Sequence, residues 1–431
     1  MDQPNPPLGW SSPELPLCAA AVRANPYRFF PGRAAKRLAS EPPPASTRHA
    51  VYRDVSFCLL CPLRGGLKSD TTCLTQRPNS VNTPNDARDT TTDRAHLLDS
   101  FVANSSWAGS QSVALAGDAS RRRYHRLTDA SSGRTAILMD APPEAGEDVR
   151  PFVKVDTYLS GIGLSAPEIY AADEQLGFLI LEDFGTDVYD QVCVQHPERE
   201  PELYDAAVDA LVTLCSAEPM QGLEDYVPRM ADLALSCYRW YAEPILGRDM
   251  ADEAVAAKAA LQPLIDSLCP ERVTILRDYH AQNLLWLPER EGAARVGQLD
   301  FQDAMLGPPA YDLISLTTDA RRDVSEQIRN RCMMRFCDQL GLNRVDFTRQ
   351  AAICSVQRNL RILMVFARMS LHFGRINYLD LIPRVWGHLQ RDLDHPELQA
   401  LAALLRAHLP EPTPSALQTL KEKCGTIPTL Q

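Results

Sequence analysis

The 431-residue chain is long enough for two to four compact domains, and its 45% hydrophobic and 23% charged residues are typical of a globular protein. A net charge of −11 argues against nucleic acid or an anionic membrane surface as the main partner. No apolar run reaches the roughly 18 residues of a membrane span, and prolines interrupt the N-terminus where a secretion signal would lie. We therefore expect a cytoplasmic protein without nucleic-acid or membrane partners, and we expect a monomer.

Residues 1–91 differ in composition from the remainder. They hold eleven basic and seven acidic residues, a net charge of +4, which leaves −15 on residues 92–431. Thirteen of the 33 prolines also fall in this stretch, which has no sustained apolar period. Cys58 and Cys61 have the spacing of half a zinc site, but no suitable second pair follows. These features predict a poorly ordered, proline-rich extension with unpaired thiols.

Residues 92–185 alternate between apolar and turn-forming segments, which predicts a small α+β lobe. A first helix is expected with Asp93 as its N-cap and Leu97, Leu98, Phe101 and Val102 on one face. A second helix is expected around 149–160. Period-two patterns predict five strands, at 112–116, 123–127, 134–139, 167–172 and 177–183.

The pattern becomes helical beyond Gly185. Apolar residues recur every three to four positions in three segments and again over a long C-terminal stretch: 201–217, 230–246, 252–268 and about 311–405. A strand–loop–strand interruption is expected at 273–301. We assign 186–410 to a second, mainly helical lobe and expect the tail, 411–431, to be frayed. The fold class is α+β and bilobal, with a small antiparallel sheet preceding a larger helical lobe.

Three polar residues follow apolar strand ends within the interruption. Asp278 is followed five residues later by Asn283 and twenty-two residues later by Asp300. Phosphoryl transfer needs a carboxylate that takes the proton of the acceptor hydroxyl, and oxygen ligands that hold a magnesium ion between phosphates. Asp278 suits the first role, and Asn283 with Asp300 suits the second.

Other interpretations of these residues exist. Asp and Asn are common in turns, and Asp300 ends a strand where it could cap the next segment. Asp278-Tyr279-His280 also looks like the start of a binuclear metallohydrolase motif, but no second His/Asp cluster completes it. The order of all three residues, after a small β lobe, favours phosphoryl transfer.

Residues 92–410 resemble the aminoglycoside phosphotransferase family of small-molecule kinases, which are relatives of protein kinases. The family's catalytic loop, His-Gly-Asp-x4-Asn, matches Leu276 to Asn283, and its metal-binding aspartate matches Asp300. The resemblance implies a protein-kinase-like fold, ATP as co-substrate, Mg2+ as cofactor, Asp278 as catalytic base, and Asn283 and Asp300 as metal ligands. It also implies that Asp312 braces the catalytic loop.

Within this family, the segments GDASRRRYHRL, ILMDAPPE, LILEDFG, RDYHAQNLLW and LDFQDAMLGPPAYDL are most similar to bacterial kinases that phosphorylate the anomeric hydroxyl of N-acetylmuramate and N-acetylglucosamine. That similarity implies an amino-sugar substrate, a sugar 1-phosphate product and a role in cell-wall recycling. The expected sugar-binding residues flank the two motifs: Tyr279, His280, Gln282, Gln302 and Asp303. His280 is expected to brace the loop rather than carry a proton.

Nucleotide contacts are expected from the small lobe. The turn Gly117, Asp118, Ala119 and Ser120 suits a backbone anion nest, and the backbone around Glu182 and Phe184 suits an adenine base. Two departures from the family stand out: Leu276-Arg277 replaces His-Gly, and the third strand lacks the usual lysine. Arginine pairs with phosphate bidentately, and among Arg121, Arg122, Arg123 and Arg126 we favour Arg123.

Two alternative functions stay open. The first is a kinase for another hydroxyl compound, such as an aminoglycoside, a choline-like alcohol or homoserine; the charge of −15 on residues 92–431 would suit a cationic acceptor. The second is a catalytically inactive binding module, which the missing lysine favours and the intact base and metal ligands oppose. A protein kinase fits less well, because no Ala-Pro-Glu segment or long activation loop separates Asp300 from Asp312.

Overall fold

The computed structural model describes residues 86–115 and 121–427, with the side chains of 86–92 left out. The predictions for residues 1–85, including Cys58 and Cys61, and for the turn Gly117–Ser120 lie outside the described residues. Within the described part, no helix combines the length and apolar character that a membrane crossing requires.

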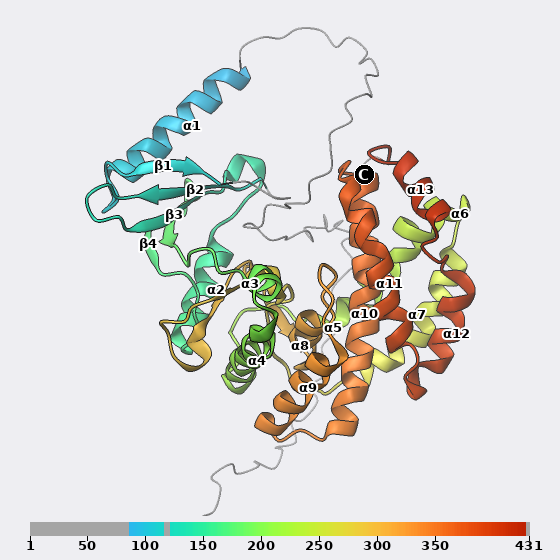
Figure 1. Cartoon of the computed structure of the whole chain (residues 1–431). Helices are drawn as coiled ribbons and strands as arrows, with labels where there is room; N and C mark the ends of the chain where they lie inside the picture. The colour runs from blue at the N-terminus through green and yellow to red at the C-terminus, as the bar shows by residue number, and fades with distance from the viewer. Residues whose placement is uncertain (1–85, 116–120, 428–431) are drawn as a thin grey trace, which may run out of the picture. The chain divides into compact units, whose positions relative to one another are not determined.

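The small lobe is built on a five-stranded antiparallel sheet with the order β1-β2-β3-β5-β4 (Figure 1). All five strands confirm the sequence pattern: β1 Gln111–Ala114, β2 Arg123–Thr128, β3 Thr135–Asp140, β4 Ile169–Asp173 and β5 Phe178–Glu182. The central strands β3 and β5 are nearly continuous apolar runs and are buried, whereas the edge strand β1 is exposed. Burial on both faces explains why the central strands lack polar alternation.

Different parts of the structure pack against the two faces of this sheet. Helix α1 (Asp86–Ala103) packs on the face formed by Leu127, Ala136, Leu138 and Ile180. The opposite face belongs to the main core, which also takes in helix α2 (Arg150–Gly161). Side chains alternate along β3, so the face opposite Leu138 carries Ile137 and Met139.

The expectations for α1 need two corrections. The helix begins at Asp86, so Asp93 lies inside it and does not cap it. Leu98, Phe101 and Val102 pack against the sheet as predicted, but Leu97 is 38% exposed. The polar sequence of the first two turns has no apolar period, which is why the pattern placed the helix start too late.

The turn between β4 and β5 depends on Gly177. This residue has φ +74°, in the left-handed region, and its carbonyl oxygen accepts a hydrogen bond from the backbone N–H of Ala141 at 2.9 Å. A Cβ atom here would lie 2.0 Å from the Ala141 carbonyl oxygen. Only glycine fits without moving the neighbouring backbone.

Replacing Gly177 with Ala is therefore expected to destabilise the fold by about 3 kcal/mol or more, of which the left-handed backbone accounts for about 1. Urea denaturation measures this change. The matched control is Gly163→Ala, because Gly163 has φ +82° but nothing within 4 Å of the added Cβ. That control should lose only about 1 kcal/mol. Equal losses in the two variants would show that the contact with Ala141 has no effect.

The helical lobe follows β5 and surrounds one long helix, α10, which packs against α5, α8 and α11 (Figure 1). The expected helical segments are confirmed, and the pattern missed α3. The helices are α3 Tyr189–Gln195, α4 Glu200–Ser216, α5 Val227–Cys237, α6 Glu243–Leu246, α7 Ala251–Asp266, α8 Ala310–Thr317, α9 Glu326–Leu340, α10 Arg344–Leu371, α11 Ile382–Asp392, α12 Gln399–His408 and α13 Pro414–Glu422.

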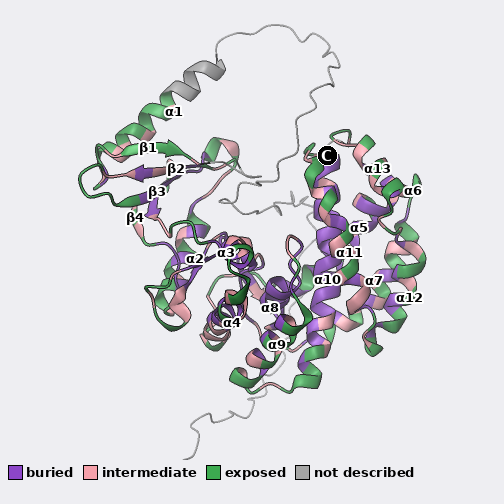
Figure 2. Ribbon diagram, viewed as in Figure 1, coloured by how far each residue is buried: buried purple, intermediate pink, exposed green. Residues whose placement is uncertain are grey.

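Burial is continuous along most of α10 (Figure 2). Its buried residues include polar ones, Gln357, Arg358, Asn359 and Arg361, together in one stretch. Buried charges need partners, so this stretch requires an explanation beyond packing.

The C-terminal tail corrects a further expectation. Residues 414–422 form α13, with Ala416 and Leu420 buried, and the helix is capped by the Thr413 side chain. Lys421 pairs with Asp380 at 3.1 Å. The described part of the tail is therefore docked rather than frayed.

Candidate active site

Two short antiparallel ladders bring the motif residues together. Strand β6 (Val273–Ile275) pairs with β9 (Met305–Gly307), and β7 (Leu284–Trp286) pairs with β8 (Val296–Gln298). The loop 276–283 leads from β6 to β7, and the loop 299–304 leads from β8 back to β9. Because both loops connect the same two ladders, they must run side by side. The backbone N–H of Leu299 donates to the Asn283 carbonyl oxygen at 3.0 Å and links them directly.

The loop 276–283, the catalytic loop of the family resemblance, holds Asp278 and Asn283 in a fixed relation. The Asn283 side-chain amide donates a hydrogen bond to the Asp278 carbonyl oxygen at 2.8 Å. That contact leaves Asn283 Oδ1 buried without a hydrogen-bond partner among the described residues. Asp278 itself is half-buried, as a base that meets an incoming hydroxyl group must be.

Asp300 on the neighbouring loop is buried and has φ +58°. Its Oδ1 accepts a hydrogen bond from Gln302 Nε2 at 2.7 Å, while Oδ2 is buried without a partner in the described part of the chain. Burial, and then the charge of Asp278, raise the pKa of Asp300 to about 7, against the effects of Gln302 and Arg122. The two hydrogen-bonded loops thus carry an unpaired carboxylate oxygen and an unpaired amide oxygen, which are the kinds of donor that a hard divalent cation prefers.

The start of the catalytic loop is held by α8. Arg277 has φ +70°, which costs a residue with a side chain about 1–2 kcal/mol. Asp312 compensates, because its two carboxylate oxygens accept the backbone N–H groups of Leu276 and Arg277 at 2.6 and 2.8 Å. Ser315 donates to the Arg277 carbonyl oxygen at 3.1 Å. Asp312 thus braces the loop, as the family resemblance implied.

The Arg277 side chain shows how the loop accommodates the loss of the family's His-Gly pair. It is buried, donates to the Asp303 carbonyl oxygen at 3.2 Å, and lies 5.3 Å from the centre of the Tyr226 ring. The left-handed position that glycine would occupy without strain is therefore filled by a side chain anchored at its far end.

A cavity of about 570 Å³, including its open mouth, adjoins Asp300. Such a volume is typical of small-molecule sites. Most of its wall is apolar and comes from both lobes: Tyr124, Ile137, Met139, Phe152, Pro167, Leu181, Glu182, Asp183, Phe184, Gly185, Leu285, Leu299, Asp300 and Gln302. The predicted residues Glu182, Phe184, Asp300 and Gln302 therefore meet at one cavity.

The hinge residues are well anchored. Glu182 pairs with Arg290, whose guanidinium also lies 5.2 Å from the Phe184 ring centre. Phe184 packs so closely over Gly297 that a Cβ on that glycine would lie 2.8 Å from the ring. Residues 182–185 of this anchored segment line the cavity.

The arginines at β2 divide between the two faces of the sheet. Arg123 pairs in register with Asp140, lies on the face that α1 covers, and its side chain is 63% exposed. The adjacent residue in the strand, Tyr124, points into the cavity. Arg122 instead donates to Glu147 at 2.9 Å, and its charge lowers the pKa of Asp300. Alternation puts Arg122 on the same face as Tyr124, so the structure favours Arg122 over Arg123 as the cation on the cavity side of the sheet.

The expected sugar-binding residues separate into two groups. Tyr279 is buried in the helical core, where its hydroxyl group donates to the Ala207 carbonyl oxygen at 2.9 Å, so the structure does not place it with the cavity residues. Gln302 lies in the cavity wall, and Asp303 contributes its carbonyl oxygen to Arg277.

His280 is buried and lies 3.4 Å from Arg321 through its Nε2. A guanidinium only donates, so Nε2 is the acceptor. Burial, and then the charges of Arg321 and Arg358, lower the pKa of His280 well below its ordinary value. A neutral ring in this position supports the loop rather than carrying a proton.

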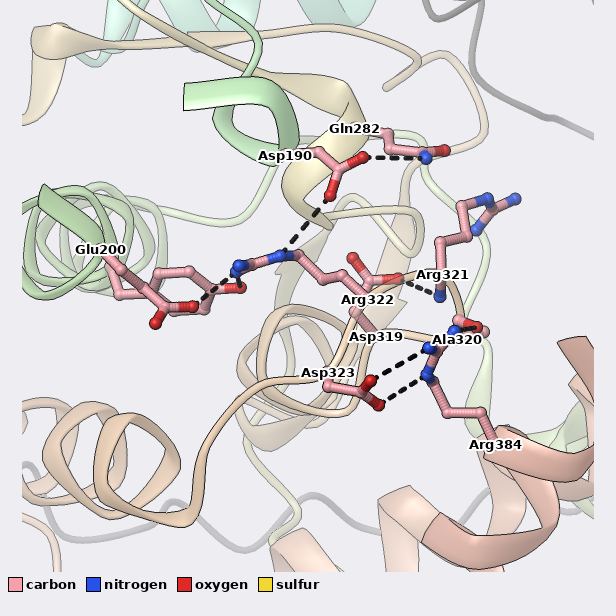
Figure 3. Close-up of polar contacts among 10 residues, drawn as sticks. Asp190, Glu200, Gln282, Asp319, Ala320, Arg321, Arg322, Asp323 and Arg384 are labelled. Atoms are coloured by element: carbon pink, nitrogen blue, oxygen red, sulfur yellow. Dashed lines mark hydrogen bonds and ion pairs between the residues drawn. The ribbon is translucent and has the colours of Figure 1, made fainter. Parts of the chain in front are cut away.

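A polar network next to the catalytic loop surrounds the segment 318–325 (Figure 3). Asp190 accepts from Gln282 at 3.3 Å and lies 3.5 Å from Arg322, which also donates to Glu200 at 2.8 Å. Asp319 accepts the backbone N–H of Arg321 at 2.8 Å. The network anchors the side chain of Gln282 and the backbone of Arg321, and the sequence pattern missed most of its members.

The known proteins similar to this chain agree with the geometry. The family model described as the phosphotransferase enzyme family matches residues 112–347. The chain belongs to this family. An N-acetylmuramate/N-acetylglucosamine kinase from Caulobacter vibrioides is 32% identical over 73% of this chain and 96% of its own length. A kinase of the same name from Pseudomonas aeruginosa is 34% identical over 69% of this chain and 88% of its own length.

Solved structures support the fold of this phosphotransferase. A Ralstonia eutropha protein assigned as an aminoglycoside phosphotransferase aligns with a TM-score of 0.50 at 12% identity, over 76% of this chain and 98% of that one. The kinase-like bilobal fold predicted from the sequence is confirmed. The family and its curated relatives make the chain a kinase with a hydroxyl acceptor.

Proposed function

We propose that this phosphotransferase uses ATP to phosphorylate the anomeric hydroxyl of an N-acetylated amino sugar, giving the sugar 1-phosphate in cell-wall recycling. The relatives named N-acetylmuramate/N-acetylglucosamine kinase support the substrate class. The observation that carries the proposal is the pair of unpaired buried oxygens, Asn283 Oδ1 and Asp300 Oδ2, on adjacent loops beside Asp278. We further propose that the enzyme acts as a cytoplasmic monomer.

In this proposal Asp278 is the catalytic base. It orients the anomeric hydroxyl group for in-line attack and accepts its proton, while the O–P bond to the sugar forms and the bond to the leaving ADP breaks. An anomeric hydroxyl is more acidic than an ordinary alcohol, so a carboxylate can serve as its base. The hydrogen bond from the Asn283 amide group to the Asp278 carbonyl oxygen holds the base in a fixed relation to Asn283.

Asn283 and Asp300 would hold Mg2+, with Gln302 orienting the Asp300 carboxylate. When bound, this ion neutralises charge on the ATP phosphates. The rise in the pKa of Asp300 to about 7, caused first by burial, indicates a carboxyl group that needs a nearby cation to stay ionised.

The apolar cavity would take the adenine base, with hydrogen bonds from the backbone between Glu182 and Phe184. The anion nest predicted for Gly117–Ser120 lies outside the described residues and stays a prediction. Arg122 is proposed as the phosphate-facing cation that replaces the family's lysine, because it lies on the Asp300 side of β2. His280, Gln282, Gln302 and Asp303 would frame the sugar.

Phosphorus NMR of the product tests the proposal. With N-acetylmuramate or N-acetylglucosamine and Mg-ATP, the product phosphorus should couple to the anomeric proton H1. Kanamycin and choline serve as competing acceptors under the same conditions. Coupling to a different sugar proton would contradict the anomeric assignment. Turnover of only kanamycin or choline would contradict the sugar assignment.

A further inference from the structure

Arginine side chains gather around the catalytic base, although the chain carries a net charge of −11. Arg277 comes from the catalytic loop, Arg321 from the segment after α8, and Arg358 and Arg361 from α10. The charge of Asp278 acts on both Arg358 and Arg361, and Arg321 and Arg358 both act on His280. These arginines share the surroundings of the base with the carboxyl groups of Asp300 and Asp312, on both of which the charge of Asp278 also acts.

Arg358 and Arg361 lie on one face of α10, because residues three apart are neighbours on a helix. They are only 4% and 7% exposed. Arg358 Nη2 donates to Ser315 at 2.8 Å, but its Nε and Nη1, and the Nε of Arg361, are buried without partners among the described residues. Buried guanidinium groups that lack acceptors are costly to a fold, so these donors suit a partner that arrives with the substrate.

No carboxylate of the described residues makes a hydrogen bond with the free donors of these two arginines. Asp312 accepts two backbone N–H groups of the catalytic loop, and Asp319 accepts the backbone N–H of Arg321 through Oδ1, while its Oδ2 is buried without a hydrogen bond to the described residues. Asp278 must stay available to the acceptor hydroxyl. The unbonded N–H groups of the two arginines therefore suit an anion from outside the chain.

The position of the cluster indicates which part of the reaction supplies that anion. Arg122 lies on the side of Asp300, where the phosphates belong in the proposed function. Arg358 instead donates to Ser315, which donates to the carbonyl oxygen of Arg277, the residue before the proposed base. The charge of Asp278 accordingly acts on both Arg358 and Arg361. An anion bound there belongs to the acceptor rather than to the nucleotide.

We propose that Arg361, with Arg358 beside it, binds a carboxylate group of the acceptor, which makes the preferred substrate an acidic amino sugar. This inference rests on the proposed sugar-kinase function and adds the residues that select the substrate. It disfavours the cationic acceptors that the overall charge would suit, because an aminoglycoside or choline would meet like charge. Of the two sugars in the relatives' name, N-acetylmuramate carries a carboxylate and N-acetylglucosamine does not.

The test compares Arg361→Met with the unaltered enzyme on three acceptors: N-acetylmuramate, its neutral carboxamide and N-acetylglucosamine. Arg361 is chosen because it makes no hydrogen bond with the described residues, whereas Arg358 also holds Ser315. Arg361→Met should lower kcat/KM for N-acetylmuramate about 30-fold, mainly through KM, because a charge-assisted hydrogen bond is lost. Values for the two neutral acceptors should change less than about 3-fold.

Two further variants separate recognition from folding. Arg361→Lys should restore part of the preference for the acid, because it retains the charge. Arg406 lies on α12 and forms an exposed ion pair with Asp394. Arg406→Met removes this pair and should leave kcat/KM for all three acceptors unchanged. Thermal melting checks that each variant is folded.

The outcomes separate the inferred carboxylate binding from the proposed sugar-kinase function on which it rests. An equal loss on the acid and both neutral acceptors, or no loss on any, would overturn the carboxylate assignment while leaving the sugar kinase intact. No turnover of any amino sugar by the unaltered enzyme would overturn both.

Discussion

Asp278→Asn should reduce kcat by about 10³-fold with every acceptor and leave the KM for ATP within a few-fold. The amide keeps the size of the side chain but cannot accept the proton of the acceptor hydroxyl, and a positioned general base typically contributes 10²–10⁴-fold. Initial rates in a coupled ADP assay, measured with saturating Mg-ATP, give both constants.

The matched control for this variant is Asp232→Asn. Asp232 is exposed on α5 and pairs with Lys258, far along the chain from the two motif loops. It should retain full activity. An Asp278→Asn enzyme with more than about a tenth of the original kcat would remove Asp278 from the role of base, and with it the mechanism proposed for the active site.

Asp300→Asn should abolish turnover and, at the same time, stabilise the ligand-free protein. Burial raises the pKa of Asp300 to about 7, above the unfolded value near 4. The folded state therefore holds the proton more tightly, so the stability from this group is full below pH 4 and is lost as the pH rises through 7. Asparagine has no proton to lose, and it tolerates the left-handed backbone at this position.

The size of that effect follows from the same linkage. Between pH 6 and pH 8, each such carboxyl group should lower the free energy of unfolding by about 1.4 kcal/mol. Asp300→Asn should remove about that much of the pH dependence, as measured by urea denaturation without Mg2+ or nucleotide. The control is Asp338→Asn. Asp338 is exposed on α9 and pairs with Arg344, so this variant should alter neither the activity nor the pH dependence of stability. Loss of stability in Asp300→Asn at pH 8 would show that the carboxylate is structural.

Asp312 is also buried and also has a raised pKa, but we assign it a different role from that of Asp300. Burial raises its pKa to about 7, while its two backbone hydrogen bonds act in the opposite direction. The unfavourable charge is thus partly compensated inside the protein, whereas the free oxygen of Asp300 has no such compensation among the described residues. That contrast is the reason to assign Asp300 to the metal and Asp312 to the loop.

Much of the fold could be predicted from the sequence, because local patterns of apolar residues determine these elements. The apolar runs of β3 and β5 and the period of α4 each predicted their element, and the two motif loops meet because their flanking strands pair. The roles of Asp278, Asn283 and Asp300 could also be proposed, because their order and their positions after strand ends match the catalytic loop and metal-binding aspartate of the family.

The remainder depends on tertiary packing that no local pattern reports. Alternation along β2 separated Arg122 from Arg123 but could not show which face meets the cavity. Arg358 and Arg361 come from a helix some eighty residues beyond the base, and only the packing of α10 brings them there. In the sequence, the one local sign of these two arginines is that they are charged residues within the otherwise apolar, buried stretch of that helix.

The measurement that tests the central claim most directly is a crystal structure with Mn2+ and a non-hydrolysable ATP analogue, using anomalous scattering to locate the metal. We predict a metal peak bonded to Asn283 Oδ1 and Asp300 Oδ2, with the terminal phosphate facing the Asp278 carboxylate and the adenine in the apolar cavity. A nucleotide bound away from these two oxygens, or a metal that contacts neither of them, would contradict the account.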